Sequence, residues 1–373
     1  MSAEGASYRD AGVDYDALDS AKRLAMLGAL STSSLLAARG GRALDASRGE
    51  PAFVFEFGGR SLALVLEGLG TKSLIARAVL EGQGVNRFDD VAYDTVAAIL
   101  NDLACVGALP LVVNAYFATG DSRWYEQQER STALLEGWRR GCEDAGCVWG
   151  GGESPTLPGM LSGQDVELAG AAVGTLPEGV APILGAGLSD GDEIVLVRSS
   201  GLHANGASLA RLLAERLPQG FATPLPEEGR SFGEAVLDPT IMYVGLVGEL
   251  LARGVAVSYL SHVTGHGLLK LMRPSAAFTY RITALPEVPP VLAFLTSEAG
   301  MDAAEAYSTF NMGVGYAVYC RPGQAGAVIA AAAELGLGAL LGGRVEQGPR
   351  RVVLEPLGVS YDSSRLELSV DGG

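Results

Sequence analysis

Two glycines, a threonine, a lysine and an acid fall within six residues of this chain, in the segment Glu67-Gly68-Leu69-Gly70-Thr71-Lys72. Glycine lets a backbone approach a bulky anion, lysine offers a point charge to a phosphate oxygen, and a carboxylate can hold Mg²⁺. The segment follows an apolar run at 62–65 that indicates a buried strand. It is not a P-loop, because Gly-x-x-x-x-Gly-Lys-Ser/Thr is absent. The pattern predicts a site for a nucleotide phosphate and its metal, against the alternative of a simple turn after a strand.

Three polar residues fall on one side of a helix predicted at 89–107. Asp94, Asn101 and Asp102 are seven and eight residues apart, so they stack along a single face of an otherwise apolar helix. Burying unpaired carboxylates is costly. Two readings remain open: a helix with one solvated face, or a set of metal or ribose ligands.

Two further glycine-containing loops carry polar residues. Gly150-Gly151-Gly152-Glu153 places an acid after three glycines, which indicates close backbone approach or positive φ. The loop at 199–206 contains His203 and Asn205 and leads into a helix predicted at 207–217. A junction of this kind offers backbone N–H groups to an anion.

The chain has three histidines, His203, His262 and His266, and all lie in glycine-containing loops between predicted elements. A single loop histidine is usually only solvated, but this shared placement favours function. The spacing of His262 and His266 does not indicate zinc without a third ligand.

Composition narrows the class of protein. The chain has 373 residues, 48% of them apolar, and a formal net charge of −16. A basic face for nucleic acid is therefore not expected, whereas a small phosphorylated ligand with Mg²⁺ is compatible with this charge. No apolar run reaches the ~18 residues of a membrane span, no signal peptide is apparent, and the four cysteines form no CxxC pair. We expect a cytoplasmic protein without a membrane partner.

Predicted strands and helices alternate in both halves, which favours an α/β or α+β fold. A connector rich in proline and glycine at 177–189 separates the halves. We predict an N-terminal domain at 1–176, a C-terminal domain at 177–360 and a polar tail at 361–373.

The sequence resembles the aminoimidazole ribonucleotide synthetase family, also called phosphoribosylformylglycinamidine cyclo-ligases. The resemblance spans residues 7 to 315 and rests on these ordered segments: SYRDAGVD, GLGTK, NDL, YFATG, GGGESPTLPGM, SGLHANG, SHVTGHG and FNMGVG. It implies an N-terminal ATP-binding domain whose sheet forms a barrel in a homodimer, and a C-terminal α+β domain. It places the ATP site between the domains, near the dimer interface.

The resemblance implies the ATP- and Mg²⁺-dependent cyclisation of formylglycinamidine ribonucleotide to aminoimidazole ribonucleotide, ADP and phosphate, in de novo purine biosynthesis. The implied metal ligands are Glu67, Asp94, Asp102 and Glu153, and the implied catalytic residues are Lys72, His203 and His262. The nucleotide contacts would be Gly68, Gly70, Thr71, Asn101, Gly151, Gly152 and Asn205. The contacts to the phosphorylated substrate would be Thr264, Gly265, His266 and Gly267.

The chain departs from the family pattern at several of these positions. Glu67 replaces the usual Asp, and only Gly40-Gly41 remains of a glycine-rich loop thought to cover the nucleotide. Ala204 follows His203 where the family has Ser, and His266 places an imidazole where the family has glycine. These departures keep two alternatives open: a kinase or ligase of the same superfamily with another substrate, and a non-catalytic binding or regulatory relative.

Overall fold

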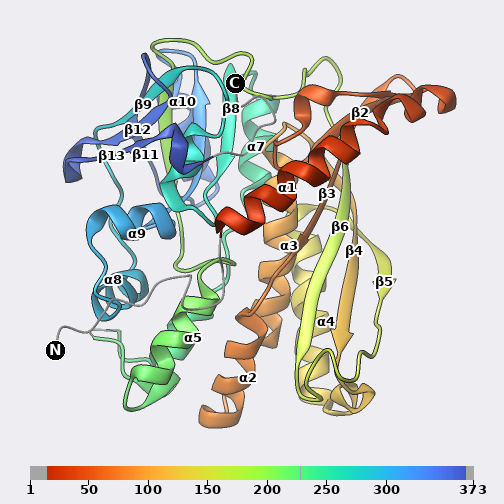
Figure 1. Ribbon diagram of the computed structural model, residues 1–373, viewed down its shortest axis with the longest axis vertical. Helices are drawn as coiled ribbons and strands as arrows, with labels where there is room; N and C mark the ends of the chain where they lie inside the picture. Colours follow the sequence, from red (N-terminus) through yellow and green to blue (C-terminus); the bar gives the residue numbers. More distant parts are fainter. Residues whose placement is uncertain (1–14, 227, 367–373) are drawn as a thin grey trace.

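Two β-sheets, one in each half of the chain, organise the protein (Figure 1). The structure is a computed structural model that describes residues 15–226 and 228–366. The N-terminal sheet has the strand order β1-β2-β3-β6-β4-β5, and the C-terminal sheet has the order β13-β12-β9-β11-β7-β10-β8. Pairing is antiparallel except between β4 and β5 and between β12 and β9. The predicted two-domain α/β arrangement is confirmed.

The strands of the N-terminal sheet are β1 (Arg42–Ala43), β2 (Phe53–Phe57), β3 (Arg60–Gly68), β4 (Leu109–Thr119), β5 (Val148–Glu153) and β6 (Val166–Thr175). Those of the C-terminal sheet are β7 (Glu193–Arg198), β8 (Val257–His262), β9 (Phe278–Ile282), β10 (Val314–Cys320), β11 (Ala339–Gln347), β12 (Arg351–Leu354) and β13 (Val359–Asp362). The helices are α1 (Tyr15–Leu30), α2 (Lys72–Gln83), α3 (Phe88–Ala104), α4 (Gln128–Ala145), α5 (Ala207–Arg216), α6 (Phe232–Val236), α7 (Val244–Ala252), α8 (Pro290–Glu298), α9 (Ala303–Thr309) and α10 (Ala325–Glu334).

The hairpin of β2 and β3 fixes the register of the strand that leads into the Glu67–Lys72 segment. Phe57 pairs with Arg60 across a two-residue turn. Both turn residues, Gly58 and Gly59, have positive φ (59° and 76°), which suits the primed turns that match strand twist.

Helix α3 is the central helix of the molecule. All of its residues except Asp89 and Asp102 are buried. One side packs on β3, β4 and β6, and α4 and α7 also contact it. A helix buried all round must find partners for its polar side chains, because an unpaired buried carboxylate or amide is costly. Asp94, Asn101 and Asp102 find such partners in the C-terminal domain.

Helix α4 lies against α3 at close range because two of its residues are glycines. A Cβ atom on Gly137 would lie 1.8 Å from the carbonyl oxygen of Asp89, and one on Gly141 would lie 2.8 Å from the Cβ of Val96. Neither position has space for a side chain unless the helices move apart.

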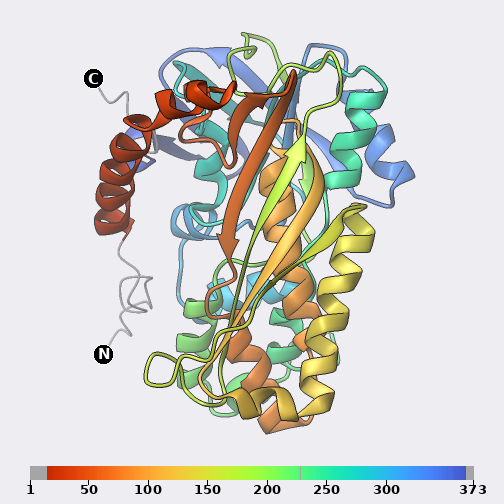
Figure 2. The same cartoon turned by 90° about the vertical axis from the view of Figure 1, so that its right-hand side faces the viewer.

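The second face of the N-terminal sheet carries exposed apolar side chains. The strand register places Leu64, Val173, Val112 and Val148 in one row across four strands. Leu64 is 43% exposed, Val148 is 64% exposed, and Leu66, on the same face of β3, is 74% exposed. In Figure 2 the strands of this sheet lie in front of α3.

The observed elements differ from the predicted ones at several points. Residues 150–153, predicted as a turn, continue the edge strand β5, with φ of 117° at Gly151. The helix predicted from residue 240 begins at Val244, and residues 267–272 form a 3₁₀ helix, η5 (Gly267–Met272). Strand β9 was not predicted.

The predicted tail from residue 361 begins later than expected. Strand β13 continues to Asp362, a short 3₁₀ helix ends at Arg365, and Leu366 is fully buried. These residues join the C-terminal core because Leu366 supplies apolar surface that the polar composition of the segment concealed. None of the helices in the described part of the chain is long and apolar enough to cross a bilayer.

Replacing Gly137 by alanine should destabilise the protein by roughly 1–3 kcal/mol, the usual cost of overpacking, because α4 must move away from α3. Thermal unfolding would measure this. Gly82 in α2 is the matched control, since a Cβ there meets nothing within 4 Å. Gly82→Ala should leave the melting temperature unchanged or raise it. Equal melting temperatures for the two variants would contradict the close packing of α3 and α4.

Candidate active site between the two domains

An aspartate–histidine pair joins the two domains. Asp102, near the end of α3, accepts a hydrogen bond from Nδ1 of His262, the last residue of β8, at 2.7 Å. Burial alone would raise the pKa of Asp102, but this hydrogen bond and the charges of His262, Lys270 and Arg273 hold the pKa below its ordinary value. When its single proton is on Nδ1, the imidazole of His262 has a lone pair on Nε2. This nitrogen is buried and has no hydrogen-bond partner within residues 15–226 and 228–366, so it can act as a base.

A second buried imidazole has the opposite proton arrangement. The N–H of Ser200 donates to Nε2 of His203 at 3.1 Å, so neutral His203 carries its proton on Nδ1. Burial, reinforced by the charges of His262 and Lys72, lowers the pKa of His203 well below its ordinary value and keeps the ring neutral. Its Nδ1 also has no partner in the described part of the chain. His203 can therefore donate a hydrogen bond where His262 can accept one.

The ring of Tyr243 lies near both imidazoles. Its centroid is 6.3 Å from that of His203 and 6.5 Å from that of His262. Asn101 of α3 fixes this tyrosine: its Oδ1 accepts from the N–H of Tyr243 at 2.7 Å, and its Nδ2 donates to the carbonyl of Ile241 at 2.9 Å. The Asn101 amide therefore bonds the C-terminal domain through both of its ends. This occupies the groups that the predicted nucleotide contact would need.

Glu67 approaches the same site from β3. It shares a strand face with Ala63 and Val65, which is the face that packs on α3. Burial and the neighbouring charge of Asp102 raise the pKa of Glu67 to about 7, although Lys270 and Arg273 oppose the shift. The charge of Glu67 is therefore coupled to those of Asp102, Lys270 and Arg273.

A further acid near this site was not identified from the sequence. The hydroxyl of Tyr259 donates to Glu50 at 2.7 Å, and Arg273 Nε lies 4.0 Å from the same carboxylate. Burial raises the pKa of Glu50 above its ordinary value, against the charge of Arg273. Glu50 lies beside a cavity of about 530 Å³ that Arg48 and Arg273 also line. The only sequence signal was the charged run Arg48-Gly49-Glu50 before β2.

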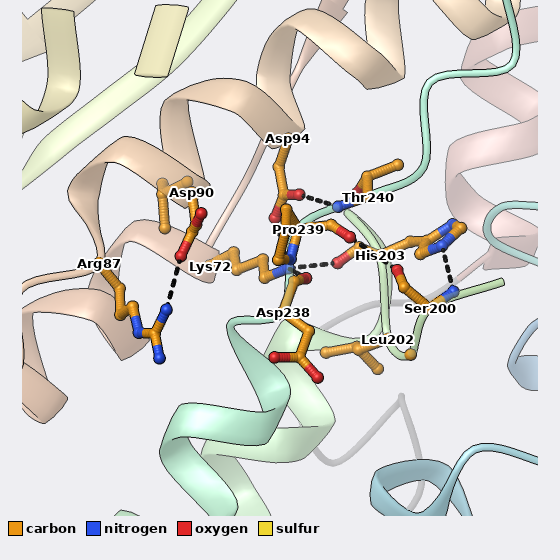
Figure 3. A network of polar contacts seen from close by, with 12 residues as sticks. Lys72, Arg87, Asp90, Asp94, Ser200, Leu202, His203, Asp238, Pro239 and Thr240 are labelled. Carbon is orange, nitrogen blue, oxygen red and sulfur yellow. Dashed lines mark hydrogen bonds and ion pairs between the residues drawn. The ribbon is translucent and has the colours of Figure 1, made fainter. Parts of the chain in front are cut away.

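Lys72, which was expected to contact the phosphates, lies inside the protein. Its side chain is fully buried at the start of α2. Figure 3 shows the ammonium group between Asp94, with which it forms an ion pair, and the carbonyl oxygens of His203 (2.9 Å) and Asp238 (3.3 Å). Asp94 in turn accepts from the N–H of Thr240 at 2.6 Å.

The four acids predicted to surround one metal do not come together. Asp94 and Asp102 are on one face of α3 as expected, but eight residues correspond to about 12 Å along a helix axis. Glu153 is exposed on edge strand β5. Glu67 and Gly152 occupy one cross-strand row, three strand spacings apart, which is about 14 Å. Across residues 15–226 and 228–366, no group of three or more histidine, cysteine or acidic residues could hold a metal. Only Glu67 and Asp102 remain neighbours.

The predicted nucleotide-contact residues fall into two groups. Gly68 ends β3, Gly70 has φ of 72°, and the Thr71 hydroxyl lies 3.0 Å from that of Ser208 in α5. These residues, with half-buried Asn205 in the loop before α5, lie at the domain boundary. Gly151 and Gly152 lie on exposed β5, together with Glu153. Within one chain, the predicted nucleotide contacts therefore do not all lie at the same site.

The predicted substrate loop follows His262 directly. Thr264 and Gly265 are half-buried, and His266 adopts a left-handed conformation with φ of 69°. The N–H of Gly267 donates to the carbonyl of Thr264 at 3.1 Å, so it is engaged within the turn. A Cβ on Gly267 would lie 2.4 Å from the carbonyl oxygen of Tyr307, which explains why glycine is needed there. The SYRDAGVD segment (7–14) lies outside the described residues.

Comparison with known proteins identifies the class to which this fold and site belong. The model of the AIR synthase related protein N-terminal domain matches residues 49–176, and that of the C-terminal domain matches residues 189–354. The chain is 36% identical over 365 residues to the phosphoribosylformylglycinamidine cyclo-ligase of Anaeromyxobacter sp. (strain Fw109-5), covering 94% of this chain and 98% of the relative. It is 34% identical to the cyclo-ligase of Pyrococcus furiosus, covering 84% and 87%. The chain belongs to the phosphoribosylformylglycinamidine cyclo-ligase family.

Solved structures of the same fold are more distant in sequence. The E. coli hydrogenase maturation protein HypE has a TM-score of 0.57 and 20% identity, covering 83% of this chain and 86% of that one. AaThiL complexed with AMPPCP and TMP has a TM-score of 0.55 and 18% identity, covering 84% and 90%. These similarities confirm the fold.

The pKa of Glu67 predicts a specific dependence of stability on pH. The folded state retains a proton on Glu67 up to about pH 7, whereas an unfolded glutamate loses it near 4.5. Between these values the native state binds more protons, so the free energy of unfolding should fall as pH rises, by about 3 kcal/mol in total.

Urea unfolding from pH 4 to pH 8 would test this, with Glu67→Gln as the comparison. Glutamine cannot ionise, so the difference in stability between the variant and wild type should move in favour of the variant as pH rises through this window. A pH-independent difference between the two proteins would show that Glu67 titrates normally.

Proposed function

We propose that this chain catalyses the ATP-dependent ring closure of formylglycinamidine ribonucleotide to aminoimidazole ribonucleotide, with release of ADP and phosphate. The observation that carries the proposal is the 36% identity to a curated cyclo-ligase across nearly the full length of both chains. The buried Asp102–His262 pair opposite His203 supplies the acid–base groups that such a reaction needs.

The reaction first transfers a phosphoryl group to the amide oxygen of the substrate, which turns a poor leaving group into a good one. The amidine nitrogen then attacks the same carbon, and phosphate leaves. In this scheme Nε2 of His262 accepts the proton released from nitrogen, while Asp102 stabilises the resulting imidazolium. His203, kept neutral by burial, donates from Nδ1 to the oxygen on which negative charge develops.

The residues near β3 fit a divalent cation. Burial, and after it the charge of Asp102, raise the pKa of Glu67, and a cation held by both carboxylates would offset the second of these effects. Mg²⁺ commonly uses one or two carboxylates and completes its shell with water and phosphate oxygens. Glu67 and Asp102 would hold it beside the phosphates of ATP. When bound, the ion neutralises charge on the transferring phosphoryl group.

Incubation with ATP, Mg²⁺ and formylglycinamidine ribonucleotide should yield phosphate and an aminoimidazole product in equal amounts. His262→Gln removes the base but can still bond Asp102, and should lower kcat by about 10²–10⁴-fold. Arg139→Gln, an exposed substitution on α4, is the control and should retain full turnover.

Other outcomes of this assay assign other functions. ADP released without an imidazole product would indicate a kinase or ligase with a different substrate, the alternative that the departure from the family pattern at His266 keeps open. Neither product would indicate a binding or regulatory protein. Unchanged turnover in His262→Gln would remove this histidine from the mechanism.

We also propose that the protein is a homodimer formed through the open face of the N-terminal sheet. The row of Leu64, Val173, Val112 and Val148, together with Leu66, forms a contiguous apolar surface on four strands. Exposed contiguous patches of this kind mark interaction sites. A second copy meeting this face would also bring another Glu153, on the edge of the same sheet, near the interface.

Leu66→Glu should convert the dimer to monomer, because a carboxylate would be buried in an apolar interface. Light scattering after size-exclusion chromatography would measure the mass. Leu335→Glu makes the same change at a leucine that is 47% exposed in the C-terminal domain, and should leave the dimer intact. A monomeric wild-type protein, or a Leu66→Glu variant that remains dimeric, would contradict the proposed interface.

A further inference from the structure

The position of Lys72 suits a different task from the phosphate contact expected of a lysine in a glycine-rich loop. Its ammonium group has three donors, and three acceptors surround it: the carboxylate of Asp94 and the carbonyl oxygens of His203 and Asp238. The side chain is fully buried. Every donor of this lysine is therefore engaged inside the protein.

We propose that Lys72 is a positioning residue that acts through His203, rather than a group that touches the transferring phosphoryl. It belongs to the N-terminal domain, whereas two of its three acceptors are backbone carbonyls of the C-terminal domain. Asp94, the other member of the ion pair, also belongs to the N-terminal domain, and it accepts a hydrogen bond from the backbone N–H of Thr240 in the C-terminal domain. One buried pair of charges thus holds two separate loops of the C-terminal domain, as Figure 3 shows.

The loop that carries His203 needs such an anchor. His203 has φ of 61°, a left-handed conformation that non-glycine residues adopt only when their surroundings impose it. Asn311 holds the preceding carbonyls of Gly201 (2.8 Å) and Leu202 (3.3 Å), and Lys72 holds that of His203 itself. With the backbone fixed at these points, the N–H of Ser200 meets Nε2 of the ring. The proton is then on Nδ1, where the proposed chemistry requires it.

The burial of Asp94 argues against a second role for Lys72 at the phosphates. Asp94 is fully buried, so withdrawing the ammonium group would leave a carboxylate with only the Thr240 N–H to compensate it. An uncompensated buried charge is strongly unfavourable. The lysine is therefore held in place throughout the reaction, and its influence reaches the substrate through the geometry of His203.

This inference rests on the proposed function only where kcat is measured, because that measurement needs the cyclo-ligase reaction. The test therefore also includes measurements that do not need activity. The protein has three histidines, and nitrogen NMR of ¹⁵N-histidine-labelled protein can report the tautomer of each. In the wild type, the His203 signals should show a neutral ring with its proton on Nδ1 from pH 6 to pH 8. A His203 ring that titrates normally in this range would overturn the proposal before any variant is made.

The variants are Lys72→Met and the double variant Lys72→Met/Asp94→Asn, which removes both charges and so avoids an unpaired carboxylate. The double variant should recover at least half of the stability that Lys72→Met loses in urea unfolding. It should bind a non-hydrolysable ATP analogue within about threefold of wild type, yet lose about 10²-fold in kcat, as misplacement of a reacting group commonly does. Its His203 signals should no longer show the single Nδ1–H tautomer.

Asp94→Asn alone is the comparison variant: it leaves the buried ammonium of Lys72 without its counter-charge and should lower stability, but Lys72 can still bond the carbonyl of His203, so the His203 signals of the folded variant should remain those of the wild type. Two further results would overturn the inference. One is a loss of nucleotide affinity of about 10²-fold with unchanged His203 signals, which is the pattern of a direct phosphate contact. The other is a double variant with wild-type turnover. If the wild type lacks cyclo-ligase activity, the proposed function fails, while the affinity and tautomer measurements still decide the role of Lys72.

Discussion

The polar side chains of α3 set the constraint on which the rest of the structure depends. This helix is buried between the N-terminal sheet and the C-terminal domain, yet it carries Asp94, Asn101 and Asp102. Buried polar groups without partners are costly, and each of these residues finds a partner in the C-terminal domain. The three contacts are spaced along one helix face, so they fix the rotation and the distance between the domains together. A site that needs groups from both domains can then form without a mobile hinge.

This constraint also determines the proton positions in the site. Asp102 accepts the Nδ1 proton of His262 and leaves Nε2 as a base, while Ser200 donates to Nε2 of His203 and leaves Nδ1 as a donor. The two imidazoles therefore have complementary roles although they are the same residue type, because each ring nitrogen is set by the bond that the other makes. Tyr243, held by Asn101, has its ring about equally far from both imidazoles.

Much of the fold and part of the site could be predicted from the sequence. The apolar run at 62–65 was sufficient for β3, and helical periodicity placed Asp94, Asn101 and Asp102 on one face. Helical periodicity predicts that Asp94 and Asp102 share a helix face, but not that they bind the same ligand. Eight residues span about 12 Å along the helix axis, so the two side chains meet different partners. Lys72 was assigned to a phosphate because its neighbours are glycines, whereas the buried acid that holds it is more than twenty residues away.

Other features depend on strand register, which the sequence does not display. The apolar row on the open sheet face combines Leu64 and Val173, which are more than a hundred residues apart, so no local pattern reveals it. Strand β5 was missed because three consecutive glycines have low strand propensity, yet Gly152 suits it: a Cβ there would lie 2.2 Å from the carbonyl oxygen of Ala115 in β4.

The most direct test of this account is a crystal structure of the protein with formylglycinamidine ribonucleotide and a non-hydrolysable ATP analogue. The account predicts that the amide group of the substrate lies between the domains, with polar substrate atoms within about 3.2 Å of Nε2 of His262 and of Nδ1 of His203, and with the triphosphate beside Glu67 and Asp102. A structure in which both nitrogens contact only protein atoms, or in which the ligands bind away from the contacts of α3 with the C-terminal domain, would contradict it.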